Sequence, residues 1–332
     1  MWRWMVPSIL LWLSASAAHS TPLPGAMVGV DWLAANRGDV VILDVRSDID
    51  SFTLAPPTEA QRRIMAESLN LCDAGPPVAA GFRVVGHIEG SVLIPAPLLQ
   101  SGSEGDGVER QRPSAESFAR ILREAGVDNE SLLVISSQGS GYDDFTWAAR
   151  LYWTLKYYGH DQVAILNGGV AAWQRAGLPL AHQPQSPEPG TFQVVEIREQ
   201  LLATTGDVEA ALSGDVVQLL DGRPLDEFSG RSKKGYVDGY GHLPGAFNLP
   251  PQRLNEAGRP AYLHSTDVLK ALFRDNGIDP AAPTIAYCNS GRLAVAHWFI
   301  LHELFGNREA SLYDGSLHEW TRDPQRPLIK LP

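Results

Sequence analysis

The chain carries the same three sequence signatures twice, in the same order. The first is an apolar run that ends in Asp-x-Arg, at residues 41–46 and 218–223. The second is a Gly-His segment that ends in proline, at 86–95 and 241–250, and the third is a glycine-containing segment that ends in tryptophan, at 167–173 and 314–320. Such a repeat predicts two related domains, 25–180 and 191–332, joined by a Pro-rich linker at 181–190.

Each half alternates short apolar runs with helical patterns. The expected strands are 40–43, 132–135 and 163–166 in the first half, and 216–220, 284–287 and 310–313 in the second. The expected helices are 115–125, 143–158, 265–276 and 293–305. This alternation predicts an α/β fold in which each domain has a mostly parallel sheet with helices on both faces. Ligands of such sheets bind at the carboxyl ends of the strands, where Cys288 falls.

Cys288 stands between an apolar run and a helical pattern, in the loop Cys288-Asn-Ser-Gly-Arg-Leu-Ala294. Backbone N–H groups at the start of a helix favour negative charge, so we expect the nucleophilic thiolate to be more populated than in a free cysteine. Arg292 adds a positive charge inside the loop. A buried core cysteine would not need these polar neighbours. A cysteine-dependent phosphatase is excluded because Ala294, not arginine, lies six residues after Cys288.

This loop resembles the active-site loop of rhodanese-type sulfurtransferases, whose pattern is roughly Cys-x-x-Gly-x-x-Ala/Ser. Together with the tandem signatures, the resemblance to the two-domain thiosulfate and 3-mercaptopyruvate sulfurtransferases covers nearly all of residues 27–332. It implies that Cys288 takes a sulfane sulfur from a donor such as thiosulfate and passes the persulfide sulfur to cyanide or a thiol. It implies no metal and no organic cofactor.

Two alternatives stay open at this stage. The donor could be 3-mercaptopyruvate, which carries a carboxylate. The protein could also be a persulfide carrier or binding protein that hands its sulfur to a protein acceptor without turning over small molecules.

The pair His297 and His302, five residues apart on an expected helix, has a poor spacing for joint metal ligation.

The site is expected to draw on several further residues. We expect the donor to be bound by the loop residues and by two lysines downstream of Phe228, namely Asn289, Ser290, Gly291, Arg292, Leu293, Lys233 and Lys234. Structural support is expected from Asp221, Arg223 and His242. The chain departs from the family at Glu227, where many two-domain members have arginine before the aromatic residue. Arg292 and the lysine pair favour thiosulfate, which is a dianion.

The first half has no thiol in the matching loop, Ser137-Gln-Gly-Ser-Gly-Tyr142, so we expect it to be an inactive, structural repeat. Counting back from Gly159 and Gly306 predicts that this loop is about four residues longer than the Cys288 loop. The first half also has an insertion of about 22 residues around 53–81. It contains Cys72, which we interpret as a free thiol without a chemical role, because a disulfide with Cys288 would block the reactive group.

The first 20 residues have one arginine, a short apolar core and then small residues. This pattern is typical of a secretory signal peptide and is too short to span a bilayer, although an uncleaved anchor is the alternative. It predicts a periplasmic or secreted protein. The net charge of −11, from 27 basic and 38 acidic residues, argues against nucleic acid or an anionic membrane as partner.

Overall fold

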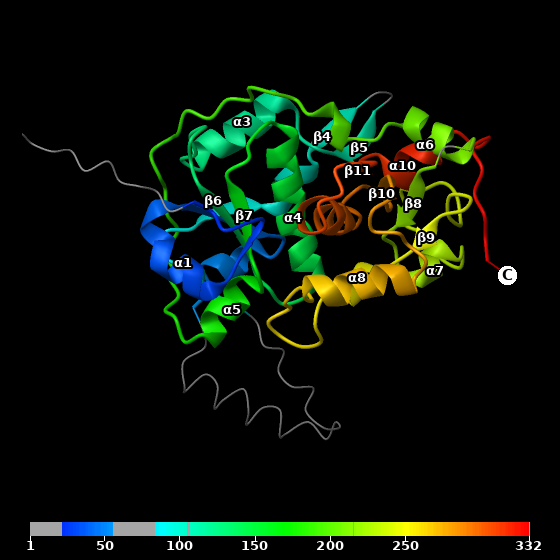
Figure 1. The fold of residues 1–332 in the computed structure, drawn as a ribbon. Coiled ribbons are helices and arrows are strands. Elements are labelled where there is room, and N and C mark those ends of the chain that lie inside the picture. Colours follow the sequence, from blue (N-terminus) through cyan, green and yellow to red (C-terminus); the bar gives the residue numbers. More distant parts are fainter. Residues whose placement is uncertain (1–21, 56–83, 105–106, 215, 332) are drawn as a thin grey trace, which may run out of the picture.

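The computed structural model describes residues 22–55, 84–104, 107–214 and 216–331. The predicted signal peptide and most of the insertion, including Cys72, lie outside these residues. The described chain forms two α/β halves that lie side by side (Figure 1). Within the described residues, none of the helices combines the length and the apolar character that crossing a membrane requires.

The first half is built on a five-stranded sheet in which every neighbouring pair is parallel. Its order is β1 (Met27–Val28), β7 (Val163–Leu166), β6 (Leu133–Ser137), β2 (Val41–Arg46) and β3 (Val92–Pro95). Its helices are α1 (Val30–Asn36), α3 (Ala115–Glu124), α4 (Tyr142–Tyr157) and α5 (Gly169–Arg175). An antiparallel hairpin, β4 (Gly102–Glu104) and β5 (Val108–Gln111), leaves this half between β3 and α3.

The second half is built on a four-stranded parallel sheet with fewer and shorter strands. Its order is β11 (Ala310–Leu312), β10 (Thr284–Tyr287), β8 (Gln218–Asp221) and β9 (Phe247–Asn248). Its helices are α6 (Thr205–Leu212), α7 (Leu225–Phe228), α8 (Thr266–Asp275), α9 (Val295–Trp298) and α10 (Ser316–Trp320). The predicted fold class is confirmed. The expected single α-helix at 293–305 is wrong, because α9 continues as a π-helix, Phe299–Leu304.

Local signals in the sequence explain where several helices begin. The Ser114 hydroxyl accepts a hydrogen bond from the Ser117 N–H at the start of α3. Thr204 and Asp207 form a reciprocal capping box at the start of α6. Each cap satisfies N–H groups that have no partner within the helix, which stabilises the helix by about 1 kcal/mol.

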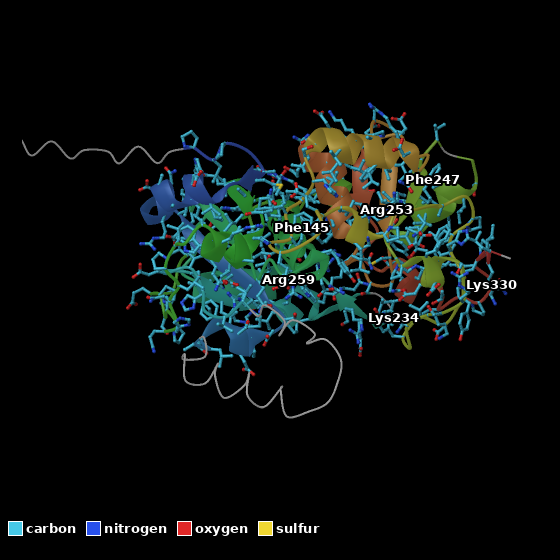
Figure 2. The ribbon with its side chains drawn as sticks, turned by 90° about the horizontal axis from the view of Figure 1, so that it is seen from below. Phe145, Lys234, Phe247, Arg253, Arg259 and Lys330 are labelled. Atoms are coloured by element: carbon cyan, nitrogen blue, oxygen red, sulfur yellow. The ribbon has the colours of Figure 1, made fainter. Side chains whose placement is uncertain are left out.

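Helix α4 is buried on nearly every side, as expected of a helix enclosed within a core. It packs on its own sheet and on the helices of the second half. Phe145 and Tyr152 contact the ring of Phe299 at centroid distances of 5.7 and 4.9 Å. Phe145 lies at the boundary between the halves (Figure 2). One apolar cluster therefore runs through both halves, so their relative position is set by a shared core.

Strand register shows which residues correspond in the two halves. Asp44 is paired with Ser136, and Asp221 is paired with Tyr287, so Ser137 is the counterpart of Cys288. The predicted longer loop in the first half is wrong. Four residues separate Ser137 from α4, whereas six separate Cys288 from α9. The additional residues of the first half lengthen α4 instead.

Candidate active site

Cys288 follows the central strand β10 and is 1% exposed. It is a free cysteine. Strand β10 lies between β8 and β11, so the thiol stands at the carboxyl end of a parallel sheet, where loops converge. The loop that follows contacts the first half through Arg292.

Ser316 is the residue that fixes the Cys288 loop. Its hydroxyl accepts hydrogen bonds from the backbone N–H groups of Cys288 and Gly291, both at 3.0 Å, and donates to the Tyr313 carbonyl at 2.7 Å. Ser316 is fully buried and has a φ of 50°, which a residue with a Cβ rarely adopts. Its counterpart in the third signature is Gly169, with a φ of 56°. Our sequence reasoning missed Ser316, although this Gly-to-Ser difference between the halves is a readable signal.

Gly291 is required by two independent constraints. Its φ is 70°, and a Cβ built on it would lie 2.6 Å from Asp314 Oδ1. Asp314 is itself held by the first half, since it accepts hydrogen bonds from Arg150 Nη1 at 2.5 Å and from the Arg112 backbone N–H at 2.9 Å. Arg150 and Arg112 of the first half therefore hold the carboxylate that limits the space at Gly291.

Four backbone N–H groups of the loop stay available. Arg292 N–H donates to the Ser290 carbonyl, and Val295 N–H donates to the Gly291 carbonyl. The N–H groups of Asn289, Ser290, Leu293 and Ala294 have no hydrogen-bond acceptor within the described part of the chain. Successive N–H groups of this kind can hold negative charge that develops on a sulfur atom attached to Cys288.

Glu227 contacts the loop directly. Asn289 Nδ2 donates to Glu227 Oε2 at 2.6 Å, and Lys234 Nζ lies 3.5 Å from Glu227 Oε1. Lys234 is thus near the loop, but a buried carboxylate offsets its charge. Lys233 donates to the Val237 carbonyl at 2.6 Å instead. The sequence marked Glu227 as a departure, but not as a partner of Asn289.

Arg292 makes its contacts with the first half. Its Nη1 donates to Asp143 Oδ1 at 2.6 Å and to Thr146 Oγ1 at 3.1 Å, and its guanidinium lies 5.0 Å from the ring centroid of Trp147. All three partners belong to α4. Leu293 is partly buried and packs against the shared core. In this structure, the charge that we expected to bind the donor ties the loop to α4.

The β4–β5 hairpin of the first half reaches across to the second half, toward β11 and α10 (Figure 1). The Gln100 amide, which precedes the hairpin, donates both to the Ser290 carbonyl at 2.7 Å and to the Arg110 carbonyl at 3.0 Å. The Arg110 guanidinium lies 4.4 Å from the ring centroid of Tyr236. Sequence reasoning could not find these residues, because tertiary packing alone brings them to the loop.

Tyr236 connects Arg110 with the cysteine loop. Burial raises the pKa of the Tyr236 phenol, and a hydrogen bond with Ser290 lowers it. The negative charge of the Cys288 thiolate raises the pKa further, whereas the positive charge of Arg110 lowers it. Tyr236 therefore lies close enough to Cys288 and to Arg110 for the charges of both to affect its pKa.

The expected support residues form a brace that occurs in both halves. Asp221 accepts hydrogen bonds from the Arg223 guanidinium at 2.6 to 3.0 Å and from the Arg223 N–H at 2.9 Å, rather than from the Cys288 loop. His242 Nδ1 lies 2.8 Å from the Phe228 carbonyl, and its ring stacks on Phe228. The first half repeats both arrangements with Asp44–Arg46 and Phe52–His87.

The two helical histidines serve different purposes. His297 is fully buried, and burial lowers its pKa to about 4, so it is a neutral core residue at pH 7. His302 Nδ1 lies 2.7 Å from Glu303 Oε1. Among the described residues, no group of three or more His, Cys, Asp or Glu side chains is arranged to hold a metal ion.

A family model and the similar curated proteins point to the same protein family. The model of the rhodanese-like domain matches residues 30–176 and 204–323. A 3-mercaptopyruvate sulfurtransferase of Escherichia coli O157:H7 is 30% identical over 307 residues, which are 92% of this chain and 98% of that protein. A putative thiosulfate sulfurtransferase of Mycobacterium tuberculosis H37Rv is 34% identical over 222 residues, which are 65% of this chain and 77% of that protein.

Solved structures agree with this result. A crystal structure of a 3-mercaptopyruvate sulfotransferase from Escherichia coli matches with a TM-score of 0.66 and 30% identity, over 88% of this chain and 98% of that one. An anaerobic ergothioneine biosynthesis enzyme from Chlorobium limicola matches with a TM-score of 0.69 over 92% of this chain and 70% of that one. Its identity is 19%, so this second likeness concerns the fold alone.

Proposed function

The chain belongs to the rhodanese-like domain family, and we propose that its second half moves a sulfane sulfur from thiosulfate to a thiophilic acceptor through a persulfide on Cys288. The observation that carries this proposal is the position of Cys288. It lies at the carboxyl end of β10, in a loop with four N–H groups that have no acceptor among the described residues. The related sulfurtransferases support the reaction class.

The first step is a displacement at sulfur. The Cys288 thiolate attacks the outer sulfur of thiosulfate, the S–S bond of thiosulfate breaks, and sulfite leaves with the electron pair. The product is a persulfide anion, Cys288–S–S⁻, and the total charge is unchanged. The N–H groups of Ser290, Leu293 and Ala294 would stabilise this anion by hydrogen bonds that shorten as charge develops.

The second step regenerates the enzyme. A thiophilic acceptor, cyanide or a thiolate, attacks the outer sulfur of the persulfide, and the Cys288 thiolate leaves. With cyanide the product is thiocyanate. Both steps are displacements on sulfur by a soft nucleophile, so the residues that matter are those that position the sulfur and hold its charge.

The donor could instead be 3-mercaptopyruvate. The observation that favours it is the 30% identity to the Escherichia coli 3-mercaptopyruvate sulfurtransferase over nearly the whole chain. In addition, Arg292 and Lys234, on which the preference for thiosulfate rested, are both paired with carboxylates. In that case the thiolate attacks the donor sulfur, the C–S bond breaks, and the carbon leaves with the electron pair as the enolate of pyruvate. The proton of the donor thiol then passes to this enolate, which gives pyruvate and the persulfide anion.

A direct experiment separates these possibilities. The protein is incubated with thiosulfate or with 3-mercaptopyruvate, and its intact mass is measured. We expect one added sulfur atom in the wild type and in Cys72→Ser, and none in Cys288→Ser. If the wild type takes up no sulfur from thiosulfate and none from 3-mercaptopyruvate, the proposed function is refuted. Retained sulfur transfer in Cys288→Ser would refute the assignment of the nucleophile.

Steady-state kinetics with cyanide then separate an enzyme from a persulfide carrier. Repeated turnover of thiosulfate is expected for the enzyme, whereas a carrier would release only one sulfur per Cys288.

We also propose that the protein is exported after cleavage near Thr21, because of the signal-like segment at 1–20. N-terminal sequencing of the mature protein that still begins at Met1 would contradict cleavage.

A further inference from the structure

A sulfur donor such as thiosulfate has an anionic end in addition to its reactive sulfur, and the structure shows which nearby cations are free to bind it. Most are already paired with carboxylates among the described residues. These pairs are Arg292–Asp143, Arg150–Asp314, Arg223–Asp221, Arg231–Asp226 and Lys234–Glu227. Each pair offsets its own charge, so binding the donor through these cations would require a carboxylate to give up its partner.

Arg110 differs from these cations. It is exposed, and no salt bridge links it to a carboxylate within the described part of the chain. Its guanidinium instead lies over the face of Tyr236, 4.4 Å from the ring centroid. This cation–π contact orients the group without using its hydrogen-bond donors, which stay available to an anion.

The backbone at Arg110 is also unusual. Its φ is 66°, in the left-handed region that residues other than glycine rarely adopt. Gln100 holds this conformation beside the catalytic loop, because one amide group donates to the carbonyls of both Arg110 and Ser290. Strained residues of this kind tend to cluster at functional sites, where the surrounding structure over-determines them.

We propose that Arg110, supplied by the first half and oriented by Tyr236, binds the anionic end of the sulfur donor. This inference rests on the proposed function and names the donor class: a small molecule whose transferable sulfur lies within a few bonds of a sulfonate-like or carboxylate group. It also gives the inactive half a part in substrate binding. Lys233 is not its equivalent, because its ammonium donates to the Val237 carbonyl.

The test uses variants that remove the charge without adding backbone strain. Asparagine tolerates a positive φ better than most residues, so Arg110→Asn is the main variant, and Arg110→Lys keeps the charge but loses the planar fork. Arg231→Ala is the matched control, because it removes one charge that is already paired with Asp226. Steady-state thiosulfate:cyanide kinetics and thermal melts are measured for all three variants at low and at physiological salt.

We expect Arg110→Asn to raise KM for thiosulfate and to lower kcat/KM by about tenfold, the effect of losing one charge-assisted contact at an exposed position. The defect should be smaller at higher salt, and Arg110→Lys should recover part of it. The melting temperature should stay at or above that of the wild type. Arg231→Ala should have unchanged kinetics.

Two outcomes would overturn the inference. One is an Arg110→Asn variant with wild-type KM and kcat/KM, and the other is a loss of activity that a lowered melting temperature fully accounts for. Failure of the proposed function is recognised separately, because wild-type protein would then take up no sulfur in the intact-mass measurement. If the wild type takes up sulfur and Arg110→Asn matches its kinetics, only the role of Arg110 is refuted.

Discussion

The Ser316 hydroxyl offers the most direct test of how the Cys288 loop is held. Ser316→Ala removes one acceptor that serves two buried N–H groups, those of Cys288 and Gly291. Each buried donor left without a partner costs about 1–3 kcal/mol, so the variant should lose about 2–6 kcal/mol of unfolding free energy. The loss of the bond to the Tyr313 carbonyl adds to this cost.

A second substitution separates hydrogen bonding from backbone strain. Ser316→Gly loses the same hydrogen bonds but removes the Cβ from a residue with a φ of 50°. A Cβ in this left-handed region costs about 1–2 kcal/mol. Glycine also gains freedom in the unfolded chain, which offsets part of that benefit. We therefore expect Ser316→Gly to be destabilised slightly less than Ser316→Ala.

The assay is urea denaturation with linear extrapolation to water, together with the intact-mass measurement of sulfur uptake. Ser91→Ala is the matched control, since Ser91 is fully buried and its hydroxyl has no partner among the described residues. We expect this control to be nearly neutral. The reasoning is refuted if Ser316→Ala costs no more than Ser91→Ala, or if both Ser316 variants take up sulfur at the wild-type rate.

Three further predictions follow from neighbouring contacts. Gly291→Ala should abolish sulfur uptake and lower stability, because its Cβ would lie 2.6 Å from Asp314 Oδ1; uptake at the wild-type rate would contradict this. Arg292→Ala and Asp143→Asn should each lower the free energy of unfolding by less than about 1 kcal/mol, because their ion pair is partly exposed. Arg292→Ala should change KM for thiosulfate less than threefold, because this pair joins the two halves. A tenfold rise in KM would instead assign Arg292 to donor binding. The free energy of unfolding should fall by up to about 3 kcal/mol as the pH falls from about 6.5 to 4, because of His297. Burial lowers the pKa of His297 to about 4 in the folded protein, so only the unfolded chain takes up a proton in that window. An unchanged pH dependence in His297→Leu would contradict this.

The sequence predicted most of the architecture because its signals are local or repeated. Strands β7 and β10 were predicted with their observed bounds, and the predictions for β2, β6, β8, β11, α3, α4 and α8 lie within a few residues of them. The sequence analysis did not predict strands β1, β3, β4, β5 and β9 or helices α1, α5, α6, α7 and α10. The apolar periodicity and the duplicated signatures are sufficient for this. The π-helix after α9 was missed because an apolar pattern does not report how many residues each turn contains.

The sequence indicated the candidate site only where one segment carries it. The Cys288 loop and the Asp221–Arg223 brace are contiguous in sequence, so they could be identified without knowledge of packing. Gln100 and Arg110 lie more than 170 residues before Cys288 and carry no motif. The place of Arg292 in the loop suggested that it binds the donor. Its partner in the structure is Asp143, which lies far away in the sequence.

Each half contacts a loop of the other half. In the first half, the loop after β6 is closed by the second half, since Ala261 N–H donates to the Gly139 carbonyl at 2.9 Å. The ring of Tyr262 packs so closely on Gly168 that a Cβ there would lie 2.6 Å from it. Backbone and an aromatic ring thus fill that end of the first sheet.

The corresponding contact at the second half is more polar. There the first half contributes the Gln100 amide to the loop carbonyl and two arginines to Asp314, which is 1% exposed. A buried carboxylate that loses its cations is strongly destabilising, so Asp314 depends on the first half for its stability. The first half therefore helps to hold the Cys288 loop, because it supplies the two arginines that pair with Asp314.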